Sequence, residues 1–150
     1  MKSILFVCLG NICRSPLAEG IARHYIEANK LEMSVDSCGT GNWHIGEPPC
    51  ENSIKVAKMH GIDISMLRAR QITSKDLTAF DTIIALDGDN MASLLQMGCP
   101  ASKLKKLGEY GYNGEDVPDP YFFDGFEGFE YVYKMIDECV ENLLFHPEAF

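Results

Sequence analysis

Residues 3–16 read SILFVCLGNICRSP and decide the fold. Ser3–Cys8 is a continuous apolar run, which is typical of a strand buried on both faces of a parallel sheet. A short turn containing Gly10 follows. Ser15 and Pro16 then predict a helix, with Ser15 as its N-cap and the proline in its first position. A strand joined to a helix by a short turn is the repeating unit of an α/β fold.

The alternation of strand and helix continues along the rest of the chain. Helices are expected at 15–29, 51–60, 89–97 and 127–145, strands at 34–38, 81–86 and 103–107, and loops at 39–46 and 108–125. Since no repeat or linker interrupts this order, we predict one domain over residues 1–150. Its class is α/β, a doubly wound, flavodoxin-like sheet of about four parallel strands with helices on both faces. Such sheets bind ligands at the carboxyl ends of their strands, and Cys8 ends the first one.

The composition is that of an ordinary globular protein, with 46% hydrophobic residues and a net charge of −9 over 150 residues. A chain of this length buries about two-thirds of its unfolded surface, so its core needs no metal or disulfide. The excess of negative charge lies in residues 107–150, which hold 11 acids and one base. An acidic balance argues against a nucleic-acid partner.

The N-terminal apolar run is too short for a secretory signal, and no small-residue cleavage site follows it. No stretch of the sequence is long enough to cross a membrane, so we expect no membrane partner. Six cysteines without a secretory signal favour reduced thiols. The expectation is a cytoplasmic monomer.

The turn after the first strand is suited to holding an anion. Its backbone N–H groups and the positive end of the following helix would converge on one point. Gly10 and Asn11 tolerate a left-handed backbone, and Arg14 offers a planar fork for two phosphate oxygens. The same field stabilises a thiolate at Cys8, placed to attack phosphorus, and Ser15 can donate a hydrogen bond to that sulfur. A cysteine that merely filled the core would not explain these neighbours.

Residues 7–16 resemble the signature loop of the low-molecular-weight protein tyrosine phosphatases. The spacing of Cys8 and Arg14 is shared with unrelated phosphatases, but Asn11 and the Ser15-Pro16 pair near the N-terminus are more specific. The resemblance implies a phosphocysteine on Cys8, a phosphotyrosine protein or peptide as substrate, inorganic phosphate as product, and neither cofactor nor metal. It assigns phosphate binding or loop support to Leu9, Gly10, Asn11, Ile12, Cys13 and Ser15.

Asp119 lies where this family carries its general acid, and the resemblance covers the whole chain. Pro118 and Pro120 fix the backbone on either side of Asp119. On the pattern alone, an Asx-type turn is the commoner role for such an aspartate. The resemblance instead implies that Asp119 protonates the leaving oxygen and then activates water. Like-charge repulsion from neighbouring acids would favour its neutral form.

The resemblance also implies aromatic walls around the pocket. Trp43 and Tyr121 match such positions, although each could be a rim aromatic without a role. Phe122 is expected as a third wall residue. It stands where many relatives have a second tyrosine, which puts regulation by phosphorylation there in doubt.

Loop support departs from the family pattern. Leu67 stands where animal relatives carry a buttressing histidine, so Arg68 or Arg70 is expected to take over that support. Asp87 resembles an acid that pairs with the loop arginine, but it could equally cap the following helix. Cys13 is either a redox partner of Cys8, as in the family, or a buried structural thiol.

Three other functions remain open. A related arsenate reductase would need two further cysteines in a close pair, and Cys38, Cys50, Cys99 and Cys139 are scattered in the sequence. Protein-arginine phosphatases of this family tend to carry threonine after the loop asparagine, where Ile12 favours the tyrosine pocket. A non-catalytic phosphopeptide-binding module would lack one of the reacting groups.

Overall fold

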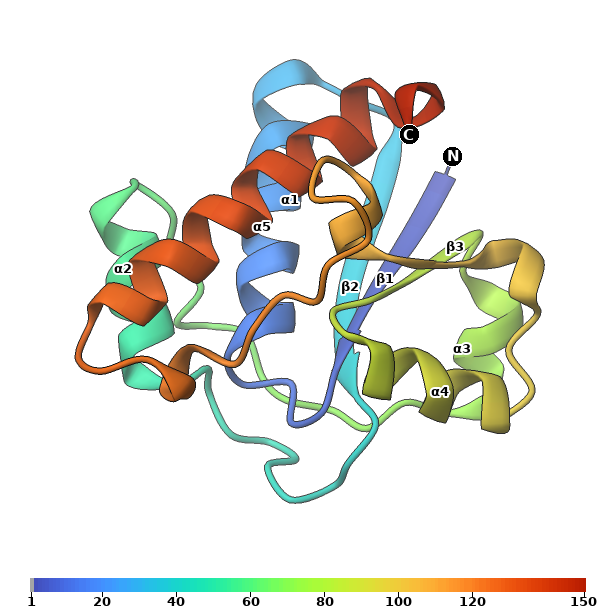
Figure 1. The fold of residues 1–150 in the computed structure, drawn as a ribbon, viewed down its shortest axis with the longest axis horizontal. Coiled ribbons are helices and arrows are strands. Elements are labelled where there is room, and N and C mark those ends of the chain that lie inside the picture. The colour runs from blue at the N-terminus through green and yellow to red at the C-terminus, as the bar shows by residue number, and fades with distance from the viewer. Residues whose placement is uncertain (1) are drawn as a thin grey trace.

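A parallel sheet of four strands forms the centre of the molecule (Figure 1). The computed structural model describes residues 2–150. The strands are β1 (Lys2–Cys8), β2 (Met33–Gly39), β3 (Thr82–Ala85) and β4 (Leu104–Lys106), in the order β2-β1-β3-β4. The chain therefore starts in the middle of the sheet, moves to one edge, and returns to the other side of β1. This reversal places the carboxyl end of β1 where α/β sheets bind ligands.

Helices cover both faces of the sheet, which confirms the predicted fold class. Figure 1 shows α1 (Arg14–Asn29), α2 (Glu51–Met59) and α5 (Glu127–Phe145) on one side and α3 (Ser74–Ala79) and α4 (Gly88–Gln96) on the other. The short helix α3 was not predicted from the sequence, because six residues are too few to show a helical periodicity. Its signal is a capping box between Thr73 and Asp76.

Side chains of β1 alternate between two apolar cores. Phe6 and Cys8 belong to the larger core, which is shared with α1, α2 and α5. Leu5 and Val7 belong to the smaller core beside β3 and α4. All four are buried, as expected for a strand covered on both faces. Within residues 2–150, no helix combines the length and the apolar character needed to cross a membrane.

The start of α1 differs from the prediction. The helix begins at Arg14, and its N-cap is Cys13, which makes no side-chain capping bond. Ser15 is therefore not the N-cap, and Pro16 lies in the third helical position. The Ser15 hydroxyl is used elsewhere, as the geometry of the site shows.

Candidate active site

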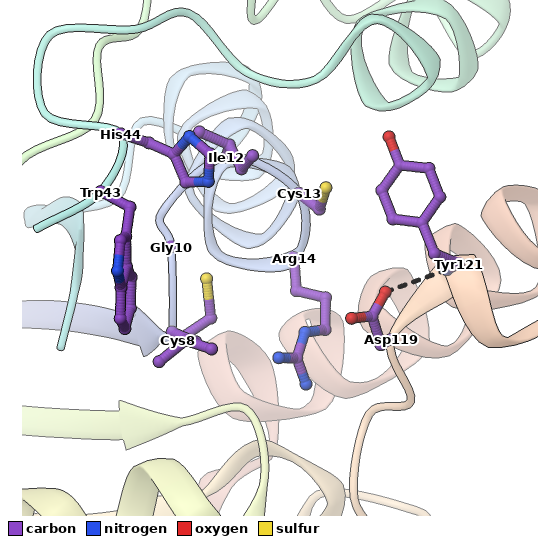
Figure 2. A pocket seen from close by; sticks show the side chains of 10 residues that line it. Cys8, Gly10, Ile12, Cys13, Arg14, Trp43, His44, Asp119 and Tyr121 are labelled. Atoms are coloured by element: carbon purple, nitrogen blue, oxygen red, sulfur yellow. Dashed lines mark hydrogen bonds between the residues drawn. The ribbon is translucent and has the colours of Figure 1, made fainter. Parts of the chain in front are cut away.

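A hollow of about 280 Å³ opens at the carboxyl end of β1 (Figure 2). Backbone hydrogen bonds from Thr40 to Cys8, from Gly41 to Leu9 and from Cys50 to Ile12 hold the segment after β2 beside the turn 8–14. The hollow therefore lies between two loops and the segment around Asp119. It is lined by Cys8, Leu9, Gly10, Ile12, Cys13, Arg14, Trp43, His44, Asp119 and Tyr121.

Cys8 is only 3% exposed, and its sulfur receives polar contacts from the turn itself. Sγ lies 2.9 Å from the Ser15 hydroxyl and accepts a hydrogen bond of 3.3 Å from the Asn11 backbone N–H. The Asn11 side chain donates to Ser15 Oγ at 2.8 Å, which leaves the Ser15 hydrogen to point at the sulfur. Both contacts stabilise negative charge on Cys8.

Asn11 supplies the left-handed turn that the sequence predicted, with φ of 57°. Its Nδ2 donates to Ser15 Oγ and to Ser37 Oγ, at 2.8 and 2.9 Å, and its Oδ1 accepts from the Arg70 backbone N–H at 3.0 Å. Gly10 is not among the left-handed residues. A Cβ on Gly10 would instead lie 3.1 Å from Cδ2 of His44, so its small size makes room for that ring.

Support for the loop comes through this asparagine rather than through a histidine. Leu67 packs against the larger core. Of the two expected arginines, Arg70 takes part, but with its backbone amide, while its guanidinium binds Asp36 and Asp76. Arg68 donates to backbone carbonyls of its own segment, at Ser65 and Leu67.

A buried polar chain behind Asn11 was missed by sequence reasoning. The Ser37 hydroxyl donates to Glu19 at 2.6 Å, and Glu19 accepts from Arg23. Glu19 is only 4% exposed, because it lies in the buried first half of α1. A glutamate within a helix expected to be buried could have indicated this chain, because a buried charge needs polar partners.

Asp87 both pairs with Arg14 and caps the following helix, the two alternatives that the sequence left open. Nη1 of Arg14 donates to Asp87 Oδ2 at 2.7 Å and to the Val117 carbonyl at 2.9 Å. The other carboxylate oxygen of Asp87 caps α4 by accepting from the Asn90 N–H. Burial alone would lower the pKa of Arg14, but the negative charges at Cys8 and Asp87 raise it above its ordinary value. Arg14 is therefore a fixed cation on the wall of the hollow.

Asp119 forms the predicted Asx-type turn and also borders the hollow. Its Oδ1 accepts a hydrogen bond of 2.9 Å from the Tyr121 backbone N–H, which begins a 3₁₀ turn at Pro120–Phe122. Figure 2 shows the same carboxyl group beside Arg14 on the hollow that contains the Cys8 sulfur. The turn thus fixes the Asp119 carboxyl group at the edge of the hollow.

Aromatic side chains flank the opening. Trp43 and Tyr121, 67% and 60% exposed, line the hollow from opposite sides in Figure 2. His44 also lines it and lies 2.9 Å from the Glu47 carboxylate through Nδ1, a site residue that sequence reasoning missed. Its position next to Trp43 in the same loop was the available signal. The expectation that Phe122 is a third wall of this hollow is wrong, because this residue is 84% exposed and does not line the hollow.

A second hollow of about 380 Å³ adjoins the first on the Arg14 side. Phe122 is part of its lining, and so are four carboxylates, those of Asp87, Asp89, Asp116 and Asp119. The acidic segment of the sequence therefore does border the site. Among residues 2–150, no group of three or more His, Cys, Asp or Glu is placed to hold a metal ion.

Cys13 contacts a cysteine that the sequence analysis did not connect with it. Its Sγ lies 2.8 Å from Sγ of Cys50, the N-cap residue of α2. A disulfide between Cys8 and Cys13 remains a prediction from the resemblance.

Such a site is suited to phosphoryl transfer through a thiolate, because a cysteine sulfur, a cation and a carboxyl group converge on one hollow. A family model described as low molecular weight phosphotyrosine protein phosphatase matches residues 3–149. The chain therefore belongs to this family.

Individual relatives agree with the family assignment. The chain is 45% identical to the low molecular weight protein-tyrosine-phosphatase YfkJ of Bacillus subtilis, over 96% of this chain and 94% of YfkJ. The crystal structure of YfkJ superposes with a TM-score of 0.90 at 42% identity, covering 99% of this chain and 96% of that one. A Drosophila arginine phosphatase superposes with a TM-score of 0.89 at 36% identity, covering 99% and 98%.

Proposed function

We propose that the protein hydrolyses phosphotyrosine monoesters in two steps, through a phosphocysteine on Cys8. The observation that carries this proposal is the convergence of the Cys8 sulfur, Arg14 and Asp119 on one hollow. Family membership supports the same reaction. A phosphate bound in the hollow would face the backbone N–H groups of the turn 9–14 and the positive end of α1.

In the first step, the Cys8 thiolate attacks phosphorus opposite the tyrosine oxygen. The P–S bond forms while the P–O bond to the phenol breaks, and Asp119 gives its proton to the departing oxygen. Arg14 and the loop N–H groups stabilise the charge on the three equatorial oxygens.

In the second step, Asp119 takes a proton from a water molecule that attacks the phosphocysteine. The P–S bond breaks, phosphate leaves, and Cys8 returns as a thiolate. The Ser15 hydroxyl, 2.9 Å from the sulfur, stabilises that leaving thiolate.

The walls favour a flat aromatic substrate. Trp43 and Tyr121 border the opening and can stack against a phenyl ring. Ile12 lines the hollow with an apolar side chain, which favours phosphotyrosine over the more polar phosphoarginine. We propose that the protein works as a monomer in the cytoplasm, where the nucleophile stays reduced.

The experiment measures kcat/KM on matched phosphotyrosine and phosphoarginine peptides, with arsenate reduction assayed in parallel. Phosphotyrosine should be turned over best, Cys8→Ser should abolish turnover, and Asp119→Ala should lower kcat by about 10²–10⁴. Asp124→Ala is the matched control, because Asp124 is exposed on the same segment and does not line the hollow. Near-normal kcat in Asp119→Ala would refute the acid assignment. If the protein bound phosphopeptides but showed no turnover that depends on Cys8, it would be a non-catalytic binding module.

A further inference from the structure

A second sulfur site lies beside the phosphate-binding turn. Sγ of Cys13 and Sγ of Cys50 are 2.8 Å apart, although 37 residues separate them in the sequence. The two backbones are joined at the same place, because the Cys50 N–H donates to the Ile12 carbonyl at 2.7 Å. The Ser53 hydroxyl bridges both sides, 3.1 Å from Cys50 Sγ and 3.2 Å from the Cys13 carbonyl. The sulfurs are therefore held together by fixed backbone.

These two residues are also the most accessible cysteines of the protein. Cys13 and Cys50 are partly exposed, whereas Cys8, Cys38, Cys99 and Cys139 are buried. The hydrogen bond from the Cys13 thiol lowers the pKa of Cys50 to about 6, and the same contact raises the pKa of Cys13. The contact therefore favours a thiolate at Cys50 beside a thiol at Cys13.

We propose that Cys13 and Cys50 are an oxidisable dithiol, a modification site at which a hydroperoxide forms a disulfide between the turn and the start of α2 while Cys8 stays free. A disulfide requires a sulfur separation of about 2.05 Å, so the atoms need to approach by less than about 1 Å. Figure 2 shows the Cys13 sulfur directed away from the Cys8 sulfur, toward the Tyr121 side of the hollow.

The chemistry balances with one peroxide. The Cys50 thiolate attacks a peroxide oxygen, so that an S–O bond forms, the O–O bond breaks and hydroxide leaves. Cys13 then loses its proton and attacks the Cys50 sulfur, so that the S–S bond forms, the S–O bond breaks and water leaves. Two thiols are oxidised, and the peroxide is reduced by two electrons. Cys8 takes no part.

Disulfide mapping tests the linkage directly. The reduced full-length protein is treated with up to one equivalent of hydrogen peroxide, its remaining thiols are alkylated, and tryptic peptides are fragmented in a mass spectrometer. Trypsin leaves Cys8 and Cys13 together on peptide 3–14, and Cys38 and Cys50 together on peptide 31–55. We expect these two peptides joined through Cys13 and Cys50, with Cys8 and Cys38 alkylated. A disulfide within peptide 3–14, or alkylation of both Cys13 and Cys50, would overturn the proposal.

Activity under peroxide gives a second readout. The oxidised wild-type protein should still turn over para-nitrophenyl phosphate, whereas Cys50→Ser should lose turnover at lower peroxide because the oxidant then reaches Cys8. Cys99→Ser, at a buried cysteine outside the hollow, should behave like the wild type. Equal loss in Cys50→Ser and the wild type would overturn the proposal that the dithiol is oxidised while Cys8 stays free. The mapping decides the linkage whichever phosphoester the enzyme hydrolyses, so it remains informative if the proposed activity fails.

Discussion

Replacing Asn11 with alanine tests the support of the phosphate-binding turn. The change removes three side-chain hydrogen bonds, two buried ones to Ser15 and Ser37 and a partly buried one from the Arg70 backbone. At about 1 kcal/mol each, these contribute about 3 kcal/mol to the free energy of unfolding. Alanine at φ of 57° adds strain, which costs about 1 kcal/mol. The expected loss is about 4 kcal/mol, or about 8–16 °C in Tm for a chain of this length.

Activity should fall as well, because Asn11 orients the Ser15 hydroxyl toward the Cys8 sulfur. A misplacement of the turn by about 1 Å costs on the order of 10²-fold in kcat/KM. Thermal unfolding and kcat/KM on a phosphotyrosine peptide measure the two effects.

Asn113→Ala is the matched control for backbone strain. Asn113 is also left-handed, with φ of 54°, but it is exposed. We expect it to lose only about 1 kcal/mol and to keep full activity. If Asn11→Ala were no less stable and no less active than Asn113→Ala, the hydrogen-bond network would not support the site.

Three further predictions concern pH, charge and close packing. Burial alone would raise the pKa of Asp76, but its bonds to Arg70 hold it below the ordinary value. Its stabilising effect is therefore complete above about pH 4 and is lost as pH falls through the lower folded-state pKa. The urea-unfolding difference between the wild type and Asp76→Asn should shrink between about pH 7 and pH 3, and a constant difference would contradict this linkage. The carboxylates of the second hollow should favour phosphotyrosine peptides with lysine neighbours. The variant Asp89→Asn should weaken this preference in kcat/KM. A preference that high salt leaves unchanged would not be electrostatic. A Cβ on Gly39 would lie 2.7 Å from the Leu9 carbonyl oxygen, so Gly39→Ala should displace the turn and lower kcat/KM; full activity would show that β2 can retreat instead.

Much of the fold could be predicted because its signals are local. The apolar run that became β1, the long helices and the alternation of strand and helix are periodic features of neighbouring residues. The six-residue α3 was missed because it is too short for periodicity, and Ser15 was misassigned as a cap. A serine before a proline predicts a cap from local preference, but the sulfur of Cys8 binds its hydroxyl instead.

The distribution of negative charge was likewise predicted only in part. The sequence located the excess negative charge in residues 107–150, and the structure shows which of these acids border the site. Asp87 and Asp89 share the second hollow with Asp116 and Asp119, although they lie outside the acidic segment. A count of charges along the chain could not bring these two pairs of acids together. They meet only because the segment before Asp119 passes the carboxyl end of β3, where the Val117 N–H donates to the Leu86 carbonyl.

The sequence by itself determined the chemistry of the turn, since Cys8, Arg14 and the left-handed Asn11 lie within seven residues and act through local backbone geometry. Tertiary structure decided everything that depends on contact between distant segments. The Arg70 amide binds the side chain of Asn11, Asp87 binds both Arg14 and the start of α4, and Cys50 contacts Cys13. Spacing along a chain carries no information about such pairs, because the parallel sheet brings strand ends together only after each strand has found its neighbours.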